Sequence, residues 1–185
     1  FETENPLNPS EKVESMVEYE TLGLMGGNLG VSDPEFVFKL NYICDDYGMD
    51  TISTGGIIGF AMELYEQGIL TEDEIGFELS FGNGENALKL ARMIAEEEGI
   101  GEVLAKGVKE AAEEIGHGSE KYAVHVKRLE VPAWDLRGRR GMGLSYATAD
   151  IGASHLRGWP ATTEPPDESA VDLVKSMVDA RNEKI

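Results

Sequence analysis

The sequence predicts a mainly α-helical protein with one or two short strands. Four segments repeat apolar residues at the three- and four-residue spacing that places them on one face of a helix. Each segment ends at a glycine, which readily adopts the left-handed conformation that closes a helix. These closing glycines are Gly48, Gly68, Gly99 and Gly116. The 185-residue chain is 41% apolar and 28% charged, which is ordinary for a globular protein with a substantial core.

The first 31 residues are expected to be irregular because prolines and glycines interrupt them, apart from a short helix that residues 18–21 can enter. Ser32 or Asp33 then caps a helix over residues 34–47, since either side chain offers an oxygen to the N–H groups of the first turn. A proline follows at the first helical position, where its fixed φ fits and no N–H donor is needed.

Three further helices are expected, over residues 53–67, 84–98 and 101–115. The first of them contains Gly55, Gly56 and Gly59. Glycine lowers helix stability by about 1 kcal/mol relative to alanine, but it lets another backbone approach closely. We therefore expect a second segment of the chain to pack directly against this helix.

Two short strands are expected, around 77–81 and over 121–131. Residues 134–160 then interleave glycines with four arginines: Arg137, Arg139, Arg140 and Arg157. One interpretation is a backbone that approaches a ligand, with guanidinium groups that bind its anionic oxygens. The other is a glycine-rich loop whose arginines neutralise nearby carboxylates. Composition alone leaves both interpretations open.

The charge of the chain excludes some partners. It has 16 lysines and arginines against 35 aspartates and glutamates, a formal net charge of −19. Such a surface repels phosphate backbones, so nucleic acid is not expected as a partner; a basic protein partner and a salt-rich cytoplasm both fit. No apolar run approaches the roughly 18 residues of a membrane span, and no signal peptide opens the chain. Because it begins at Phe1 without methionine, we expect a segment of a longer protein.

Cysteine and histidine give few candidates for a metal site. Cys44 is the only cysteine, which excludes an internal disulfide and a self-contained iron–sulfur or cysteine–zinc site. It falls on the apolar side of the helix over 34–47, so we expect a buried structural thiol. His117 lies between glycines and is expected in a turn, and His125 is expected at an exposed strand position.

The sharpest local feature is the run of residues 45–50, Asp-Asp-Tyr-Gly-Met-Asp. Asp45 and Asp46 occupy the last turn of a helix, where the macrodipole disfavours negative charge. Gly48 reverses the chain, so Asp50 can lie near Asp45. Carboxylates grouped there can accept hydrogen bonds from a planar heterocycle or bind a metal. Alternatively, Asp50 caps the next helix and Asp45 is solvated.

Residues Asn41 to Gly55, which contain this run, resemble the first pterin-binding segment of the aldehyde ferredoxin oxidoreductase family. Further matching motifs occur in the family's order on both sides of it. They are Tyr19-Glu20-Thr21, Asn28-Leu29-Gly30, Phe81-Gly82-Asn83, Gly138-Arg139-Arg140-Gly141-Met142 and His155-Leu156-Arg157. The similarity covers roughly residues 14–160.

The resemblance implies a helical domain of that family's type and its chemistry. This chemistry is the oxidation of aldehydes to carboxylic acids at a tungsten (or molybdenum) bis-pterin, with a 4Fe-4S cluster passing electrons to ferredoxin. It implies that Glu20 and His155 act as catalytic acid and base, and that no residue of this chain binds the metal. The residues expected to bind the cofactor are Asp45, Gly48, Met49, Asp50 and Arg157.

The family pattern also implies what this chain lacks. Its cluster cysteines, its β-rich N-terminal domain and its second pterin-binding segment are expected outside residues 1–185, so the isolated chain is expected to be inactive and to carry no cofactor. Some members bridge their subunits through a metal bound by a glutamate in the first helix. Lys39 stands at that position, so this bridging site is not expected, although the full-length protein can still be a homo-oligomer.

We expect two domains. Residues 1–131 form the helical domain that carries the first pterin-binding segment, and residues 132–185 begin a second, truncated helical domain, with a polar linker at 161–168 and a helix over 172–181. The full-length protein is expected in the cytoplasm. The alternative is a stand-alone helical binding or interaction module that shares the domain without the redox chemistry.

Overall fold

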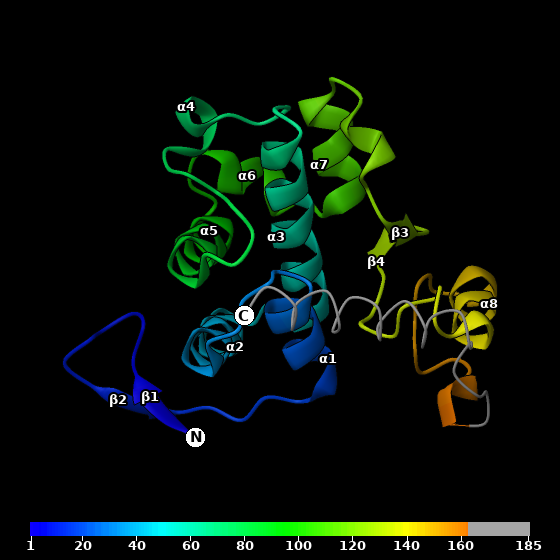
Figure 1. Ribbon diagram of the computed structural model, residues 1–185, viewed down its shortest axis with the longest axis horizontal. Helices are drawn as coiled ribbons and strands as arrows, with labels where there is room; N and C mark the ends of the chain where they lie inside the picture. Colours follow the sequence, from blue (N-terminus) through cyan, green and yellow to red (C-terminus); the bar gives the residue numbers. More distant parts are fainter. Residues whose placement is uncertain (163–185) are drawn as a thin grey trace, which may run out of the picture.

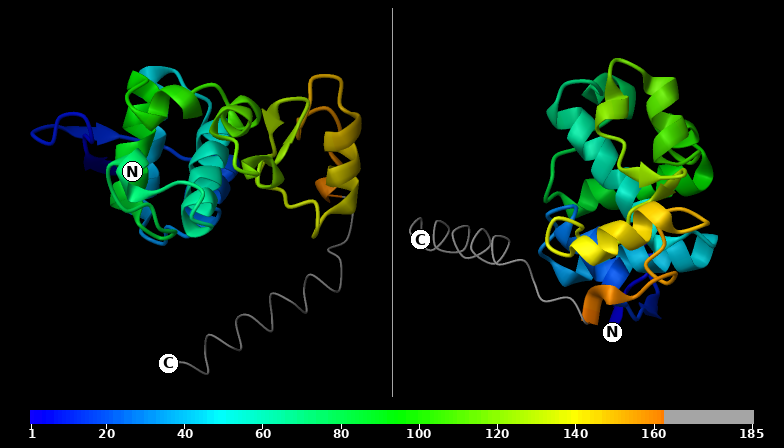
Figure 2. Two further views of the ribbon diagram at one scale, coloured as in Figure 1. Left: turned by 90° about the horizontal axis from the view of Figure 1, so that it is seen from above. Right: turned by 90° about the vertical axis from the view of Figure 1, so that its right-hand side faces the viewer.

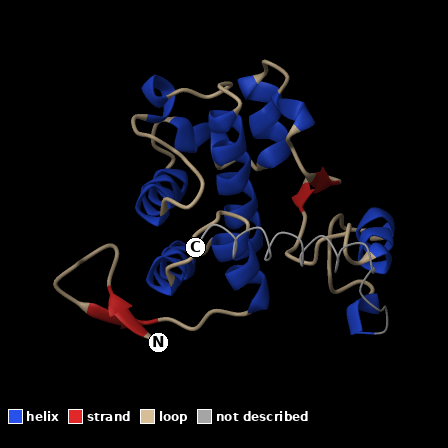
Figure 3. Ribbon diagram, in the orientation of Figure 1, coloured by secondary structure: helices blue, strands red, loops and turns tan. Residues whose placement is uncertain are grey.

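The computed structural model describes residues 1–162 and confirms a mainly helical protein with a few short strands (Figure 3). The elements, in chain order, are β1 (Glu2–Glu4), β2 (Lys12–Glu14), α1 (Tyr19–Thr21), the π-helix η1 (Leu22–Gly27), α2 (Pro34–Tyr47), α3 (Thr51–Glu66), α4 (Glu72–Ile75), α5 (Gly84–Glu96), α6 (Ile100–Leu104), α7 (Val108–Ile115), the 3₁₀ helix η2 (Ser119–Lys121), β3 (His125–Val126), β4 (Leu129–Glu130), α8 (Arg140–Thr148) and the 3₁₀ helix η3 (Pro160–Thr162).

Helix α3 lies at the centre of the larger part of the molecule and contacts η1, α2, α5 and α7 (Figure 1). The glycines of α3 allow this close packing, as expected from the sequence. A Cβ atom added at Gly55 would lie 2.7 Å from the Cβ of Leu24 and 3.0 Å from its carbonyl carbon. In addition, the Asn28 side chain donates a hydrogen bond to the carbonyl of Gly55, at 3.1 Å. The π-helix η1 is therefore held directly against α3.

Both ends of α2 follow the sequence pattern. The Asp33 side chain accepts a hydrogen bond from the N–H of Glu35 at 2.9 Å, which makes Asp33 the cap. At the other end, Gly48 adopts φ +70°, the left-handed conformation that ends the helix. Helix α3 begins at Thr51, two residues before the expected start, because Asp50 caps it.

Several expectations about local structure are wrong, including the irregular structure expected over residues 22–27, which form η1. Residues 77–81 form no strand; no neighbouring segment pairs with them, and Phe77 and Phe81 pack against the core instead. The single helix expected over 101–115 is two helices, α6 and α7, because Gly107 adopts φ +90° between them. The strand expected over 121–131 is a short hairpin.

This hairpin pairs β3 with β4 in antiparallel register, Val126 opposite Leu129. Lys127 and Arg128 form its two-residue turn with φ of +51° and +76°, the left-handed values that suit the twist of a hairpin. A second hairpin pairs β1 with β2, Thr3 opposite Val13, where the sequence predicted irregular structure. It projects from one end of the molecule, and α8 lies at the other end (Figure 2).

The described residues pack into two hydrophobic clusters. The first core cluster joins η1, α2, α3, α5, α6 and α7. The second core cluster consists of Met142, Tyr146, Ala153 and Ala161, with Val126, Leu129, Val131 and Trp134 packed against them. Because this cluster uses residues before and after position 131, the domain boundary expected there stays a prediction. The expected helix over 172–181 and most of the expected linker lie outside the described residues.

None of the helices within residues 1–162 has the length and apolar character needed to cross a membrane.

Candidate active site

Glu20 is a buried carboxylate in α1. Only 5% of the residue is exposed, and its Oε2 accepts a hydrogen bond from the backbone N–H of Ala133 at 2.6 Å. The other oxygen, Oε1, is also buried and has no hydrogen-bond partner among the described residues. A buried carboxylate oxygen without a partner is costly, so it marks a place where a ligand or substrate is expected to contact the protein.

Two tyrosines lie near this carboxylate. Burial raises the pKa of Tyr146, and the negative charge of Glu20 raises it further. The same two causes raise the pKa of Tyr19, which Arg139 partly opposes. The hydroxyl of Tyr146 donates to the carbonyl of Trp134 at 3.1 Å. Both phenols are therefore neutral hydrogen-bond donors at physiological pH.

His155 lies in the loop after α8 and is half-buried. Its ring centre is 5.8 Å from that of Trp159, and Trp159 in turn contacts Trp134. Trp134 follows Ala133, the residue that binds Glu20. Glu20 and His155, which are distant in sequence, are thus linked through a row of aromatic side chains. That they face one cavity in a full-length protein stays a prediction.

Asp45 and Asp50 flank the turn between α2 and α3, and both are exposed. The Oδ2 of Asp45 accepts a hydrogen bond from the Asn41 side chain at 2.9 Å. The Oδ2 of Asp50 accepts one from the N–H of Ser53 at 2.6 Å, so Asp50 is the cap of α3. Each of these bonds uses one oxygen of the carboxylate, Oδ2 in both residues.

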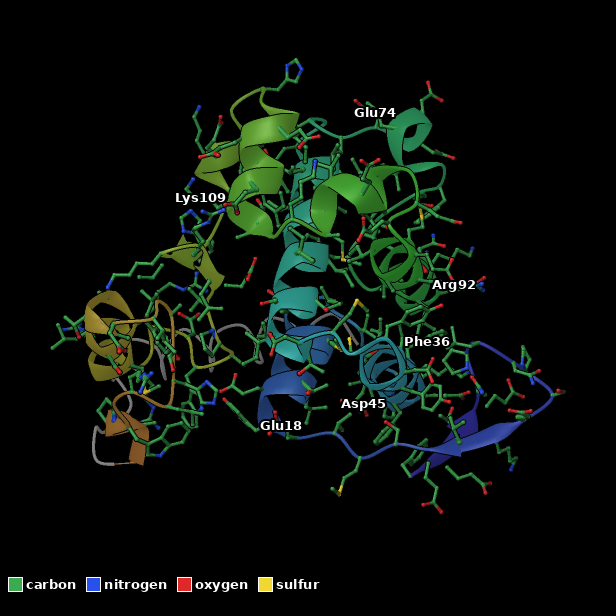
Figure 4. All side chains as sticks on the ribbon, turned by 180° about the vertical axis from the view of Figure 1, so that it is seen from behind. Glu18, Phe36, Asp45, Glu74, Arg92 and Lys109 are labelled. Carbon is green, nitrogen blue, oxygen red and sulfur yellow. The ribbon has the colours of Figure 1, made fainter. Side chains whose placement is uncertain are left out.

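A cavity of about 290 Å³ adjoins this turn. It is lined by Met49 and Asp50, by the first turns of α3, and by the side chain of Glu130. Met49 is half-buried and packs against the first core cluster. Figure 4 labels Asp45 on α2 and Glu18 just before α1, at the end of the molecule opposite Glu74 and Lys109.

Glu130 is a buried carboxylate that the sequence did not single out. Its Oε1 accepts a hydrogen bond from the N–H of Val108 at 2.7 Å, and its Oε2 accepts one from the hydroxyl of Ser53 at 2.8 Å. It joins β4 to the first turns of α3 and α7, where a negative charge is favourable. Glu130 also lines a larger cavity of about 860 Å³, between η1, α3 and residues 131–137.

The remaining candidates are placed as follows. Arg157 is exposed, and its Nε lies 3.1 Å from the carboxylate of Asp150. Cys44 is fully buried, as expected, and burial raises the pKa of its thiol to about 12.

His117 adopts φ +55° in a turn, as expected. His125 lies in β3 but is half-buried, and its Nδ1 has no partner among the described residues.

No group of three or more histidine, cysteine, aspartate or glutamate side chains in the described part of the chain is arranged to hold a metal ion. The carboxylates above are spread over separate elements instead.

Comparison with known families decides the assignment. The model for domains 2 and 3 of aldehyde ferredoxin oxidoreductase matches residues 2–184. The chain belongs to the aldehyde ferredoxin oxidoreductase family. It is 40% identical over 181 residues to the tungsten-containing aldehyde ferredoxin oxidoreductase of Thermococcus kodakarensis, a match that covers 92% of this chain and 29% of that protein.

Two further proteins resemble this chain. The aliphatic sulfonate oxidoreductase, WOR-like subunit, of Pyrococcus furiosus is 44% identical over 144 residues, covering 75% of this chain and 23% of that protein. Among solved structures, the active-site complex BamBC of benzoyl coenzyme A reductase matches with a TM-score of 0.61 and 30% identity, over 76% of this chain and 22% of that one. The chain spans less than a third of the length of these relatives.

Proposed function

We propose that this chain is the part of a tungsten-pterin oxidoreductase that helps to hold the pterin and supplies the acid and base residues for aldehyde oxidation. Membership of the family supports this proposal. The single observation that carries it is the environment of the Glu20 carboxylate. Its carboxylate is buried, is held by the Ala133 amide, and keeps one oxygen without a partner. A structural glutamate would be expected to satisfy both oxygens.

The reaction adds the oxygen of water to the aldehyde carbon and gives a carboxylic acid, two protons and two electrons. When bound, a tungsten-pterin would supply the acceptor for the two electrons, and a 4Fe-4S cluster would supply their route to ferredoxin. Glu20 takes a proton from the attacking water through Oε1, while the Ala133 amide fixes the position of the carboxylate. His155 exchanges the second proton with solvent, because an imidazole ring has nitrogens that can donate and accept a proton and this side chain is only half-buried.

The turn between α2 and α3 fits a pterin. A pterin edge presents parallel N–H donors, and the exposed carboxylates of Asp45 and Asp50 each have an oxygen beyond the one bonded within the protein. Met49 would contact the cofactor through its apolar side chain, and Arg157 would bind an anionic oxygen of the cofactor.

Cys44 does not fit as a cluster ligand. Its thiol is fully buried with a raised pKa, whereas iron–sulfur clusters bind thiolates. The cluster would therefore take its thiolates from cysteines outside this sequence.

The test uses the full-length protein with Glu20→Gln and His155→Gln variants. Each variant should retain tungsten and lose turnover of an aldehyde by about 10²–10⁴-fold, the usual contribution of a general acid or base. Matched controls are Glu18→Gln and His117→Gln, which change exposed residues of the same types. A Glu20 or His155 variant that keeps both its tungsten and wild-type turnover would remove that residue from the mechanism.

A further inference from the structure

Four rings from three separate segments of the chain form a continuous row. The ring centres of Tyr19 and Trp134 are 4.9 Å apart, those of Trp134 and Trp159 are 5.9 Å apart, and those of Trp159 and His155 are 5.8 Å apart. These distances lie within the range of favourable aromatic contacts. We call these four side chains the aromatic row.

The aromatic row connects the two residues that we propose as acid and base. One end begins at Tyr19, the neighbour of Glu20 in α1. In the middle, Trp134 follows Ala133, whose N–H holds the Glu20 carboxylate. The other end is His155 itself. An aldehyde group placed between Glu20 and His155 would therefore have the aromatic row beside it.

Much of the row is open. Tyr19 is 55% exposed and Trp159 is 45% exposed, although large aromatic side chains usually bury most of their surface. The guanidinium of Arg139 lies 5.8 Å from the centre of one Trp134 ring, so the open ring surfaces belong mainly to Tyr19 and Trp159.

Two buried polar atoms, one in the aromatic row and one in the neighbouring residue Glu20, lack a hydrogen-bond partner among the described residues. The indole N–H of Trp134 is buried without a hydrogen-bond partner among the described residues, as is Oε1 of Glu20. One of these atoms is a donor and the other an acceptor. Open ring surfaces next to an unpaired buried donor and acceptor are the features that bind a flat apolar ligand with a polar group at one end.

We propose that the aromatic row is the substrate-recognition surface and that it selects aldehydes that carry an aromatic ring. This inference rests on the proposed function, since it takes Glu20 and His155 as the reacting residues. An aromatic substrate can stack on, or meet edge to face, the open rings of Tyr19 and Trp159. A saturated ring of the same size buries similar area but lacks the π contacts.

Two aldehydes of similar size separate these effects in the full-length protein: benzaldehyde and cyclohexanecarboxaldehyde. In the Trp159→Leu variant, kcat/KM for benzaldehyde should fall by about two- to tenfold, as expected for the loss of one aromatic pair, while that for the saturated aldehyde changes less. Trp159→Phe should restore most of the preference because it retains a ring. Phe77→Leu is the matched control, since it removes a half-buried ring from the first core cluster.

A second readout does not need turnover. In saturation-transfer NMR, the ring protons of benzoate should receive magnetisation from the wild-type protein and much less from Trp159→Leu and Tyr19→Leu. Cyclohexanecarboxylate should show a weaker signal that these substitutions leave unchanged. Absence of benzoate binding to the wild type would mean that another part of the full-length protein covers the row, and would overturn the inference.

The two proposals fail separately. A tungsten-loaded protein that oxidises both aldehydes with an unchanged ratio in Trp159→Leu overturns the aromatic selectivity and leaves the proposed function in place. A tungsten-loaded wild type that oxidises neither aldehyde, but binds benzoate through Tyr19 and Trp159, overturns the proposed function and leaves only the binding of aromatic ligands by the aromatic row in place.

Discussion

The carboxylate of Glu130 accepts a hydrogen bond from the hydroxyl of Ser53 at 2.8 Å, although 77 positions separate the two residues. The backbone N–H of Ser53 is bound at the same time by Asp50. The first turn of α3 is therefore held from both sides, by the turn that we propose as the pterin-binding segment and by β4. This arrangement links the position of that turn to the packing of β4 against α3 and α7.

Replacement of Glu130 by glutamine should destabilise the chain. Glutamine keeps the shape but loses the charge that binds the N–H of Val108, so the free energy of unfolding should fall by about 1–3 kcal/mol. Denaturant unfolding of the two proteins measures the difference. Glu114→Gln, which changes a surface carboxylate paired with Lys106, is the control and should stay close to wild type. Equal stability of the wild type and both variants would show that the negative charge of Glu130 contributes nothing to stability.

Two substitutions at Asp50 separate its capping role from cofactor binding. Asparagine caps a helix as well as aspartate does, so Asp50→Asn should leave stability unchanged, whereas Asp50→Ala should cost about 1 kcal/mol. In the full-length protein both should lose tungsten on dialysis faster than wild type, because one charge-assisted hydrogen bond to the pterin contributes about 1.5–3 kcal/mol. Full tungsten retention by Asp50→Asn would show that Asp50 caps α3 and does not bind the cofactor. Asp45→Asn should weaken retention in the same way.

Alanine at Gly55 should destabilise the protein, whereas alanine at Gly27 should not. At Gly55 the added Cβ would meet the Leu24 backbone at 3.0 Å, so Gly55→Ala should destabilise the protein by about 1–3 kcal/mol through overpacking. At Gly27, in η1, none of the described residues outside the adjoining chain has an atom within 4 Å of the added Cβ. Gly27→Ala should therefore be neutral or stabilise by up to about 1 kcal/mol. Thermal unfolding of the two variants measures both effects, and a stable Gly55→Ala protein would contradict the direct packing of η1 on α3.

Local patterns in the sequence predict the well-formed helices. The cap at Asp33 and the stop at Gly48 define α2 because both act through bonds within a few residues. The break at Gly107 was not predictable in this way, since the apolar spacing continues through it and only the three-dimensional structure shows its left-handed φ. The β1–β2 hairpin has no apolar alternation to reveal it. The stacking of Phe1 on Phe38, with ring centres 4.0 Å apart, holds it against α2.

The candidate site likewise combines residues that the sequence predicted with contacts that only the structure shows. The family resemblance placed Glu20 and Asp50 among the site residues, yet it could not reveal that Ala133 binds Glu20 across 113 positions. Glu130 had no signal in the sequence, because its partners lie 22 and 77 positions away and it is one acidic residue among 35. Such contacts depend on how distant segments pack, and periodicity contains no information about them.

Both tryptophans of the chain, Trp134 and Trp159, belong to the aromatic row, and the first core cluster contains neither. Tryptophan fluorescence therefore reports mainly on the second core cluster and its contact with α1, while helices α2, α3 and α5 contribute strongly to far-ultraviolet circular dichroism. When the protein is unfolded, coincident midpoints from the two signals mean that the two core clusters melt as one cooperative unit. Separate midpoints mean that the two core clusters unfold independently. The hydrogen bonds of Glu20 and Glu130 then connect two separate folding units.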